Sequence, residues 1–440
     1  MLSLSKRINT IIWWHMGESI VYHGFLLAHQ LLLFATISAS LYGLIGSLFS
    51  AIYLTVTISN AGLDITLSSL YPTYIRSKQS ITKLLGIQLL INCSISSIII
   101  IGMATFWHQN NFFTRLFPII LLLIFIENVK KLLKVILQLS LQFNITVLGE
   151  LLTIISYVCL IWGCYAIGFS ITPYLIFSFL LFVTVIETLL FFHYVYYWFM
   201  MLPSSVKQIK NNNMYKEIIK NRTVTFLNQI HHSFFSGNFL VLITTKFFGF
   251  DCAGIIKFSS SIAFNITTIV KKIFGTTTNI LVASIKNKNI KIQQNFFSTI
   301  TSKMYHVLFC LSIFFIINYK LLLPATGTDQ HVAIYLSFLI IFIENFFITY
   351  EQFYIMQDKK SYLLFLNCFT LFLLYSVYSS TILFSVPLLL LVIFLIRLFY
   401  FIATGILSFF LWQFKPIKTI RPFYIMSSIL ISLIVWFYYN

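Results

Sequence analysis

Charged side chains, and acidic ones above all, are scarce in this chain. Aspartate and glutamate together number 11 among 440 residues. All charged residues make up 9% of the sequence, whereas soluble domains hold about 25%. Hydrophobic residues make up 59%, which excludes a soluble globular domain. The apolar stretches are continuous and of helical length, so they exclude a barrel of short alternating strands and predict an all-α polytopic membrane protein.

The chain also lacks the sequence patterns of metal sites and of hydrolytic enzymes. Its cysteines form no CxxC pair and lie singly in or beside apolar segments, which is typical of packed core residues. A Walker A sequence, HExxH, GxSxG and an Asp-rich metal loop are all missing. The sequence therefore predicts no enzyme, no metal and no cofactor. The six cysteines are Cys93, Cys159, Cys164, Cys252, Cys310 and Cys368.

Apolar runs of about 20 residues predict thirteen membrane spans, six in each half of the chain and one more at the end. No cleavable signal peptide precedes them, since Glu18 interrupts the first apolar run, which is predicted to be a retained signal anchor. The predicted spans cover residues 13–37, 41–70, 81–106, 115–138, 146–168, 172–201, 223–248, 253–283, 300–323, 331–356, 361–381, 384–413 and 422–439.

The basic residues predict the orientation of these spans. With the N-terminus in the cytoplasm, most of the 29 lysines and arginines fall in cytoplasmic connections. Arg222 is assigned to the cytoplasmic segment 203–222, and the outside connections hold only Arg115, Lys246 and Lys320. The positive-inside rule therefore predicts a cytoplasmic N-terminus and a C-terminus outside. It also accounts for the net charge of +18 without a nucleic-acid partner.

A repeated pentapeptide suggests that the two halves are homologous. IFIEN occurs at Ile124–Asn128 and at Ile341–Asn345, in predicted spans four and ten. Aligning the halves lays residues 42–58 over 253–269 and places Glu187 opposite Arg397. Both halves begin in the cytoplasm, so this is a parallel repeat about an axis along the membrane normal. Repeats of this kind hold their substrate between the halves near the midplane.

The predicted architecture is thus two six-helix lobes in a parallel pseudo-twofold repeat, plus one extra C-terminal helix. The longest polar segment is interpreted as a cytoplasmic linker that can include a surface helix, with an ordinary long loop as the alternative. The boundaries are 1–202 for the N-terminal lobe, 203–222 for the linker, 223–413 for the C-terminal lobe and 414–440 for the additional span.

Two segments carry a resemblance to a known family: SASLYGLIGSLFSAIYLTVTISNAGLD (38–64) and TTKFFGFDCAGIIKFSSSIAF (244–264). They resemble the first outer turn and second helix, and the corresponding second-lobe turn, of the multidrug/oligosaccharidyl-lipid/polysaccharide exporter superfamily. Within it, the chain resembles bacterial flippases for O-antigen or capsule repeat units. The resemblance implies a MATE-like fold, the bacterial inner membrane and a polyprenyl-pyrophosphate-linked glycan as partner. Membrane lipids and polymerase or ligase components of the glycan pathway are further implied partners.

The first predicted span departs from some relatives in carrying Glu18 and histidines rather than arginines. His15, Glu18, Tyr22 and His29 lie within a narrow arc, because 11 residues are close to three helical turns. A polar stripe on an apolar helix faces a water-filled cavity or another helix. It therefore indicates either a cavity wall that binds sugar hydroxyls, or hydrogen bonding between helices.

Other ionisable residues inside predicted spans are functional candidates because a charge there is costly. Glu127 precedes Lys130, Lys131 and Lys134 at helical neighbour spacings, which favours local ion pairs near the cytoplasmic headgroups. Glu344 and Glu351 lie two turns apart with no basic residue nearby in the sequence, which suits proton exchange unless other helices supply lysines. Candidates for coupling or charge pairing are Asp64, Glu127, Glu187, Glu344 and Glu351.

Basic side chains in the second half are candidates for binding a pyrophosphate. The planar guanidinium of arginine matches the geometry of pyrophosphate oxygens. The residues predicted to bind the lipid headgroup are therefore Lys257 and Arg397, with His231 and His232. Adjacent histidines point about 100° apart on a helix, so at most one fully faces a cavity. An ion pair between Arg397 and Glu187 is the structural alternative.

Two functions follow, with a third that the sequence disfavours. The leading hypothesis is a flippase that moves a polyprenyl-pyrophosphate-linked oligosaccharide by alternating access. A cation-coupled multidrug exporter of the same fold is the alternative, supported by the acidic residues and opposed by Lys257 and Arg397. A glycosyltransferase or polymerase usually needs a large outside loop, and the longest ones here, 106–116 and 323–331, are too short.

Overall fold

The computed structural model describes most of the first two thirds of the chain and two further helices. Predicted spans 300–323, 331–356 and 422–439 lie outside the described residues, apart from isolated positions. The candidates Asp64, Glu344 and Glu351 and the side chain of His15 also lie outside them. The described ranges are 2–63, 66–67, 70, 78–107, 111–140, 142–202, 214–285, 291, 294–295, 336, 340, 360–379 and 385–412.

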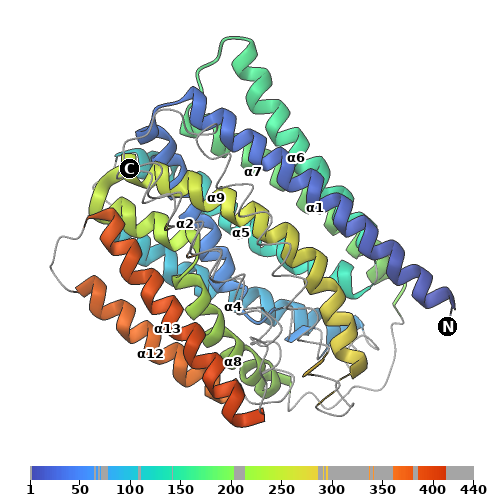
Figure 1. Cartoon of the computed structure of the whole chain (residues 1–440). Coiled ribbons are helices and arrows are strands. Elements are labelled where there is room, and N and C mark those ends of the chain that lie inside the picture. Colours follow the sequence, from blue (N-terminus) through green and yellow to red (C-terminus); the bar gives the residue numbers. More distant parts are fainter. Residues whose placement is uncertain are drawn as a thin grey trace. The chain divides into compact units, whose positions relative to one another are not determined.

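All regular elements in the described ranges are α-helices (Figure 1). Eight stretches among them are long and apolar enough to cross a membrane, so the predicted all-α, multi-pass membrane architecture is confirmed. The helices are α1 (Leu2–Thr36), α2 (Ala39–Ser59), α4 (Lys78–Trp107), α5 (Asn111–Leu139), α6 (Phe143–Ala166), α7 (Pro173–Met200), α8 (Met214–Phe234), α9 (Gly237–Ile285), α12 (Lys360–Ser379) and α13 (Val386–Trp412).

Local sequence explains where several helices begin and end. Thr172 caps α7 by accepting a hydrogen bond from the backbone N–H of Leu175, and Pro173 follows at the first helical position. α2 ends at Ser59, and Gly62 has a φ of 76°. The predicted span 41–70 is therefore not one continuous helix, because a left-handed residue cannot continue an α-helix.

Helix α9 contains a break at Gly249, whose φ of 83° and ψ of −179° are not helical. The break divides α9 into residues 237–248 and 250–285, and the helix axis changes direction there. It falls between the predicted spans 223–248 and 253–283. Helix α8 begins at Met214, inside the segment 203–222 that the sequence assigns to a linker.

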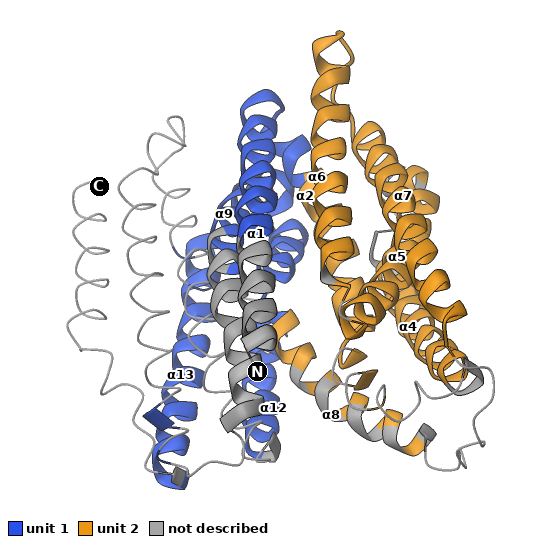
Figure 2. Cartoon of the chain, turned by 90° about the vertical axis from the view of Figure 1, so that its right-hand side faces the viewer, with its two compact units in different colours: residues 1–43, 234–440 blue, residues 44–233 orange. Residues whose placement is uncertain are grey.

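The chain forms two compact units (Figure 2). Unit 1 comprises residues 1–43 and 234–440, and unit 2 comprises residues 44–233. The predicted lobes, 1–202 and 223–413, assign the first helix differently, because α1 packs against α9 inside unit 1. The division into two homologous lobes stays a prediction.

Helices α1 and α9 of unit 1 run antiparallel, since His23 contacts Asn265 whereas the later Phe34 stacks on the earlier Phe258. The segment after α1 approaches α9 very closely. A Cβ on Gly43 would lie 1.8 Å from the carbonyl oxygen of Phe250. Only glycine permits backbones to come so near.

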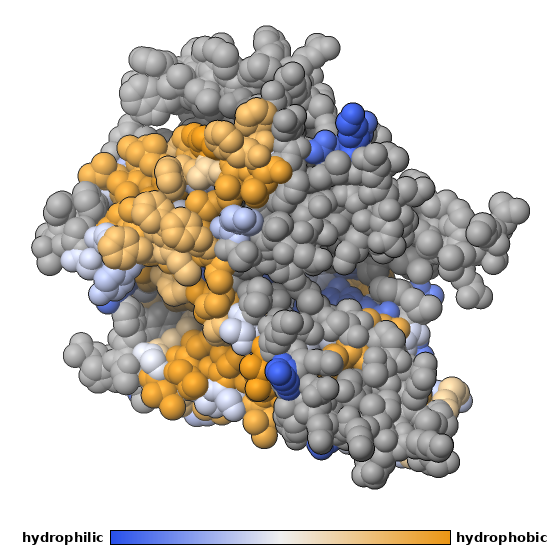
Figure 3. Space-filling model, turned by 90° about the horizontal axis from the view of Figure 1, so that it is seen from below, coloured by the Kyte–Doolittle hydropathy of each residue, from blue (hydrophilic) through white to orange (hydrophobic). Residues whose placement is uncertain are grey.

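Unit 2 has an apolar core between its helices. α5 packs against α4, α6 and α7, and the core contains Leu84, Leu132, Ile136 and Phe191. Many large apolar side chains elsewhere in the described residues are exposed instead. The face seen in Figure 3 is largely apolar where its residues are described, as a lipid-facing surface should be.

Candidate functional site

Arg222 is buried in unit 2, although the sequence assigned it to a cytoplasmic linker. It lies on α8, and its Nη1 donates to Gln88 Oε1 at 2.7 Å and to Asn92 Oδ1 at 2.8 Å. Its Nη2 donates to the backbone oxygen of Ser59 at 2.6 Å. Arg222 is thus a buried, bonded residue of unit 2, and the linker boundary at 222 stays a prediction. The Arg222 guanidinium joins α8 to α4 and to the end of α2.

A chain of amide side chains continues from Arg222 through unit 2. Asn92 Nδ2 donates to Asn60 Oδ1 at 2.7 Å, and Asn60 Nδ2 donates to Asn128 Oδ1 at 2.6 Å. Asn128 Nδ2 then donates to Ser96 Oγ at 2.7 Å. All of these side chains are buried. We call this set, with Gln88 and Ser59, the amide network.

Sequence reasoning missed the amide network because it concentrated on charged residues. One signal was present, since Asn128 is the last residue of the first IFIEN copy. The structure makes that asparagine a central residue of the network. The corresponding Asn345 lies outside the described residues.

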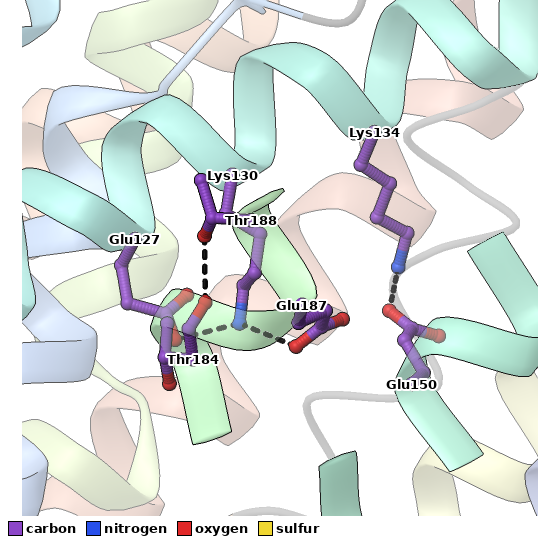
Figure 4. Close-up of polar contacts among 7 residues, drawn as sticks. All are labelled: Glu127, Lys130, Lys134, Glu150, Thr184, Glu187 and Thr188. Carbon is purple, nitrogen blue, oxygen red and sulfur yellow. Dashed lines mark hydrogen bonds and ion pairs between the residues drawn. The ribbon is translucent and has the colours of Figure 1, made fainter. Parts of the chain in front are cut away.

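A cluster of charged residues lies between α5, α6 and α7 (Figure 4). Lys130 Nζ is 2.6 Å from Glu127 Oε1 and 3.3 Å from Glu187 Oε2. Lys134 pairs with Glu150 on α6. The predicted pairing of Glu127 with Lys130 is confirmed. Lys130 is largely buried and lies between two carboxylates.

This cluster gives Glu187 a partner that the sequence did not predict. Its side chain is almost fully buried, and it bonds Lys130 of the same unit. The sequence had paired Glu187 with Arg397 as a structural alternative. In the structure the ion pair of Glu187 is with Lys130, so two carboxylates share one ammonium group.

Helix α1 bonds α9 through polar residues that lie next to the predicted stripe in the sequence. Glu18 and His29 are buried, and Tyr22 is half-buried. Next to them, His23 Nδ1 lies 3.0 Å from Asn265 Oδ1, and Asn265 Nδ2 donates to Gln30 Oε1 at 3.3 Å. The interpretation of this helix as one that hydrogen-bonds a neighbour is thus realised through His23 and Gln30, which the sequence did not single out.

The two basic candidates of unit 1 contact the same short segment. Arg397 is fully buried on α13, with its guanidinium carbon 4.2 Å from the ring centre of Phe235 and 6.0 Å from that of Tyr400. Lys257 Nζ donates to Asn238 Oδ1 at 3.4 Å. Phe235 and Asn238 are three residues apart, so Lys257 and Arg397 both bind the region where α9 begins.

The two histidine candidates belong to unit 2. His231 is fully buried and His232 is half-buried, with ring centres 5.4 Å apart in an edge-to-face arrangement. Their different burial agrees with the expectation that adjacent helical side chains point in different directions. Among the described residues, no group of histidine, cysteine and acidic side chains is placed to hold a metal ion.

The helical architecture is that of the MATE transporters of the MOP superfamily, as solved structures show. An inward-facing multidrug resistance MATE transporter of the MOP superfamily shares 14% identity, with a TM-score of 0.59 over 88% of this chain and 93% of that one. An outward-facing multidrug resistance MATE transporter also shares 14% identity, with a TM-score of 0.60 over 91% of this chain and 93% of that one. No protein-family model and no curated protein matches the chain.

A third solved structure is a MOP superfamily transporter from Pyrococcus furiosus, described as having a binding pocket of reversed polarity that suggests a different function. It shares 14% identity, with a TM-score of 0.62 over 94% of this chain and 96% of that one. At such identities the likeness establishes the fold. What the protein transports has to be inferred from its own residues.

Proposed function

We propose that the protein is a transporter that works by alternating access and flips a polyprenyl-pyrophosphate-linked oligosaccharide across the bacterial inner membrane. The fold supports transport, because solved neighbours include inward-facing and outward-facing MATE transporters. The observation that carries the choice of substrate is that the buried Arg397 and the half-buried Lys257 both contact the segment where α9 begins, at Phe235 and Asn238 respectively. Both cations suit an anionic headgroup.

The energetics of Arg397 favour a binding role. An arginine at the centre of a membrane helix costs about 2.5–3.5 kcal/mol on insertion scales, so intramembrane arginines usually serve a function. The Phe235 ring stabilises the positively charged guanidinium by a cation–π interaction. The planar fork of donors can then bind two oxygens of a pyrophosphate, and Lys257 adds a second positive charge nearby.

The remaining candidates have roles in the same proposal. His231 and His232 would complete the headgroup-binding set with Lys257 and Arg397. Glu18, Tyr22 and His29 would bind sugar hydroxyls. Asp64, Glu127, Glu187, Glu344 and Glu351 remain the candidates for ion coupling or charge pairing. Glu127 and Glu187 share one lysine. The pair therefore carries one negative charge in excess when both are ionised, and a proton or another cation would balance it.

A cation-coupled multidrug exporter is the second candidate. Its specific support is Glu18, an acidic side chain buried in a membrane-spanning stretch of α1. Buried carboxylates favour cationic substrates, and two of the solved neighbours are described as multidrug resistance transporters. The half-buried Lys257 and the fully buried Arg397 oppose it.

Ligand-dependent stability of the purified protein separates the two candidates. The melting temperature is measured with polyprenyl pyrophosphate, polyprenyl monophosphate and the lipophilic cation tetraphenylphosphonium. A flippase should be stabilised most by the pyrophosphate. Arg397→Lys keeps the charge but loses the fork, so it should weaken this binding by about tenfold, or about 1.4 kcal/mol.

The matched control is Lys246→Gln, which removes a charge from an exposed position of α9. It should leave the binding unchanged. Stabilisation by tetraphenylphosphonium alone would contradict the flippase and favour the multidrug exporter. Restored glycan export in a flippase-deficient strain, with no change in drug resistance, would support the flippase in cells.

A further inference from the structure

A groove runs between α4 and α5 on the apolar surface of unit 2. The two helices pack side by side (Figure 2), and the groove between them has a volume of about 820 Å³. Its walls include Ile101, Leu121 and Phe125, which are 65%, 45% and 49% exposed. Apolar side chains this exposed on a membrane-spanning helix face lipid, so the groove opens sideways into the bilayer.

The floor of the groove belongs to the amide network. Ser96 and Asn128 line it, and their hydrogen bond of 2.7 Å is the end of the chain of amides that begins at Arg222. Ser97, also in the lining, donates to the backbone oxygen of Cys93 at 2.8 Å. These polar groups already bond one another, and the other side chains of the groove's described lining are apolar. The groove therefore suits a hydrocarbon chain.

The size and position of the groove fit a segment of such a chain. The α4 lining runs from Cys93 to Ile101, which is about 12 Å along a helix axis, less than half of a hydrocarbon core of about 30 Å. In the predicted orientation this part of α4 lies in the outer half of the membrane. A hollow at that depth is filled by hydrocarbon, because water would lack hydrogen-bond partners along its walls.

We propose that the α4–α5 groove binds the polyprenyl chain of the transported lipid, with the Ser96–Asn128 hydrogen bond as its floor. The proposal rests on the proposed function, which requires the lipid tail to stay in the bilayer while the headgroup passes through the protein. The tail must then leave the protein between two helices. The α4–α5 groove extends from the exposed apolar surface to the buried amide network.

A second groove supplies an internal comparison. It lies between α12 and α13 in unit 1 and has a volume of about 600 Å³. Its described lining is aromatic and aliphatic, including Phe365, Phe399 and Phe410, and contains no member of the amide network. We expect it to hold ordinary acyl chains without preference for polyprenyl.

The test is photocrosslinking of the whole protein in lipid vesicles. One probe is polyprenyl pyrophosphate with a diazirine in its chain, and the other is a phosphatidylcholine with a diazirine in an acyl chain. Labelled residues are mapped by mass spectrometry. The polyprenyl probe should label residues 93–101 and 117–128 more than the phospholipid does, and unlabelled polyprenyl pyrophosphate should compete. The α12–α13 groove should show no such preference.

Two matched substitutions sharpen the result. Leu121→Trp fills the groove, whereas Leu189→Trp places the same bulk on an exposed position of α7. Labelling by the polyprenyl probe should be lost in the first variant and retained in the second. Both should keep the wild-type melting temperature without ligand, because both side chains face lipid.

The outcomes separate this inference from the proposed function. Equal labelling by both probes would show a site for bulk lipid and overturn the inference. Polyprenyl labelling elsewhere, with stabilisation by pyrophosphate intact, would overturn the groove and leave the flippase standing. The absence of any stabilisation by polyprenyl pyrophosphate would overturn both.

Discussion

Asn128 on α5 bonds three other residues of the amide network. It donates to Ser96 and accepts from Ser59 and Asn60, at distances of 2.7, 2.8 and 2.6 Å. Asn128→Ala would remove all three bonds. The Ser59 hydroxyl and the Asn60 amide nitrogen would keep their bonds to the backbone oxygen of Val56. We expect a loss of about 1–3 kcal/mol of stability, seen as a lower melting temperature in detergent.

The control for this substitution is Asn144→Ala, which removes the same group from an exposed position of α6. Its melting temperature should equal that of the wild type. Equal melting temperatures for Asn128→Ala and the wild type would mean that the network adds no net stability. Membrane hydrogen bonds average only about 0.6 kcal/mol each, so the number of bonds decides the size of the effect.

Lys130 is the only ammonium group that the described contacts place between Glu127 and Glu187. Lys130→Met would leave two carboxylates facing each other with no cation between them. Removing one partner of a buried ion pair costs about 3–5 kcal/mol, so the melting temperature should fall sharply. Adding Glu187→Gln should restore part of the loss, because one of the two facing charges is removed.

Lys216→Met, at an exposed position of α8, is the control for lost positive charge and should have little effect. Failure of Glu187→Gln to restore any stability to Lys130→Met would show that the lysine acts through packing rather than charge. The double variant thus distinguishes an electrostatic role from a steric one.

The sequence identified the polar residues inside predicted spans, but it predicted only those bonding partners that are near in the sequence. Glu127 and Lys130 are three residues apart on one helix, so their pairing followed from helical geometry. The contact of Glu187 with Lys130 joins residues 57 apart, and that of Arg222 with Gln88 joins residues 134 apart. Such contacts depend on how helices pack, which local spacing does not encode.

At the scale of elements, the crossing near Gly43 and Gly254 is the tightest that the described residues show. A Cβ on Gly254 would lie 2.4 Å from the carbonyl oxygen of Ala39. Gly43→Ala and Gly254→Ala should therefore each push the backbones apart and lower the yield of folded protein. Monodispersity on size-exclusion chromatography and the melting temperature measure this.

Gly86→Ala is the matched control, because a Cβ at this position of α4 meets nothing within 4 Å. Alanine is about 1 kcal/mol better than glycine in a helix, so this variant should be as stable as the wild type or slightly more. A wild-type melting temperature for Gly43→Ala would contradict the close crossing.

Helix existence was easier to predict than helix ends. Most predicted spans within the described ranges contain one long helix, because apolar length is a strong signal. The predicted span 223–248 is instead divided between the end of α8 and the start of α9. The early end of α2 at Ser59 was missed, since residues 61–70 are apolar enough to extend the run. The sequence allowed a surface helix within 203–222 but predicted neither its start at Met214 nor the burial of Arg222, which depends on tertiary contacts.

At the scale of the whole molecule, the glycine crossing bears on the predicted repeat. The alignment of residues 42–58 with 253–269 places Gly43 opposite Gly254. The structure brings these two glycines against each other, with a Cβ on Gly43 2.8 Å from the backbone nitrogen of Gly254. Equivalent residues of a twofold repeat touch only near its axis. The repeat stays a prediction, and this contact is where its axis would pass.

Orientation is the last property of the whole chain that can be tested directly. Alkaline phosphatase needs disulfides, so in a bacterium it is active only outside the cytoplasm. Fused after Gly168, in the connection between α6 and α7, it should be active. After Gln142, between α5 and α6, it should be inactive. The alternation of basic residues predicts this pattern.

A third fusion, after Asn440, tests the predicted thirteenth span. An odd number of spans puts the two termini on opposite sides, so the phosphatase should be active there as well. Activity after Gly168 but not after Asn440 would mean that residues 422–439 do not cross the membrane. Activity after Gln142 and none after Gly168 would invert the topology. It would also move the α4–α5 groove to the cytoplasmic leaflet, where a flippase would collect its lipid rather than release it.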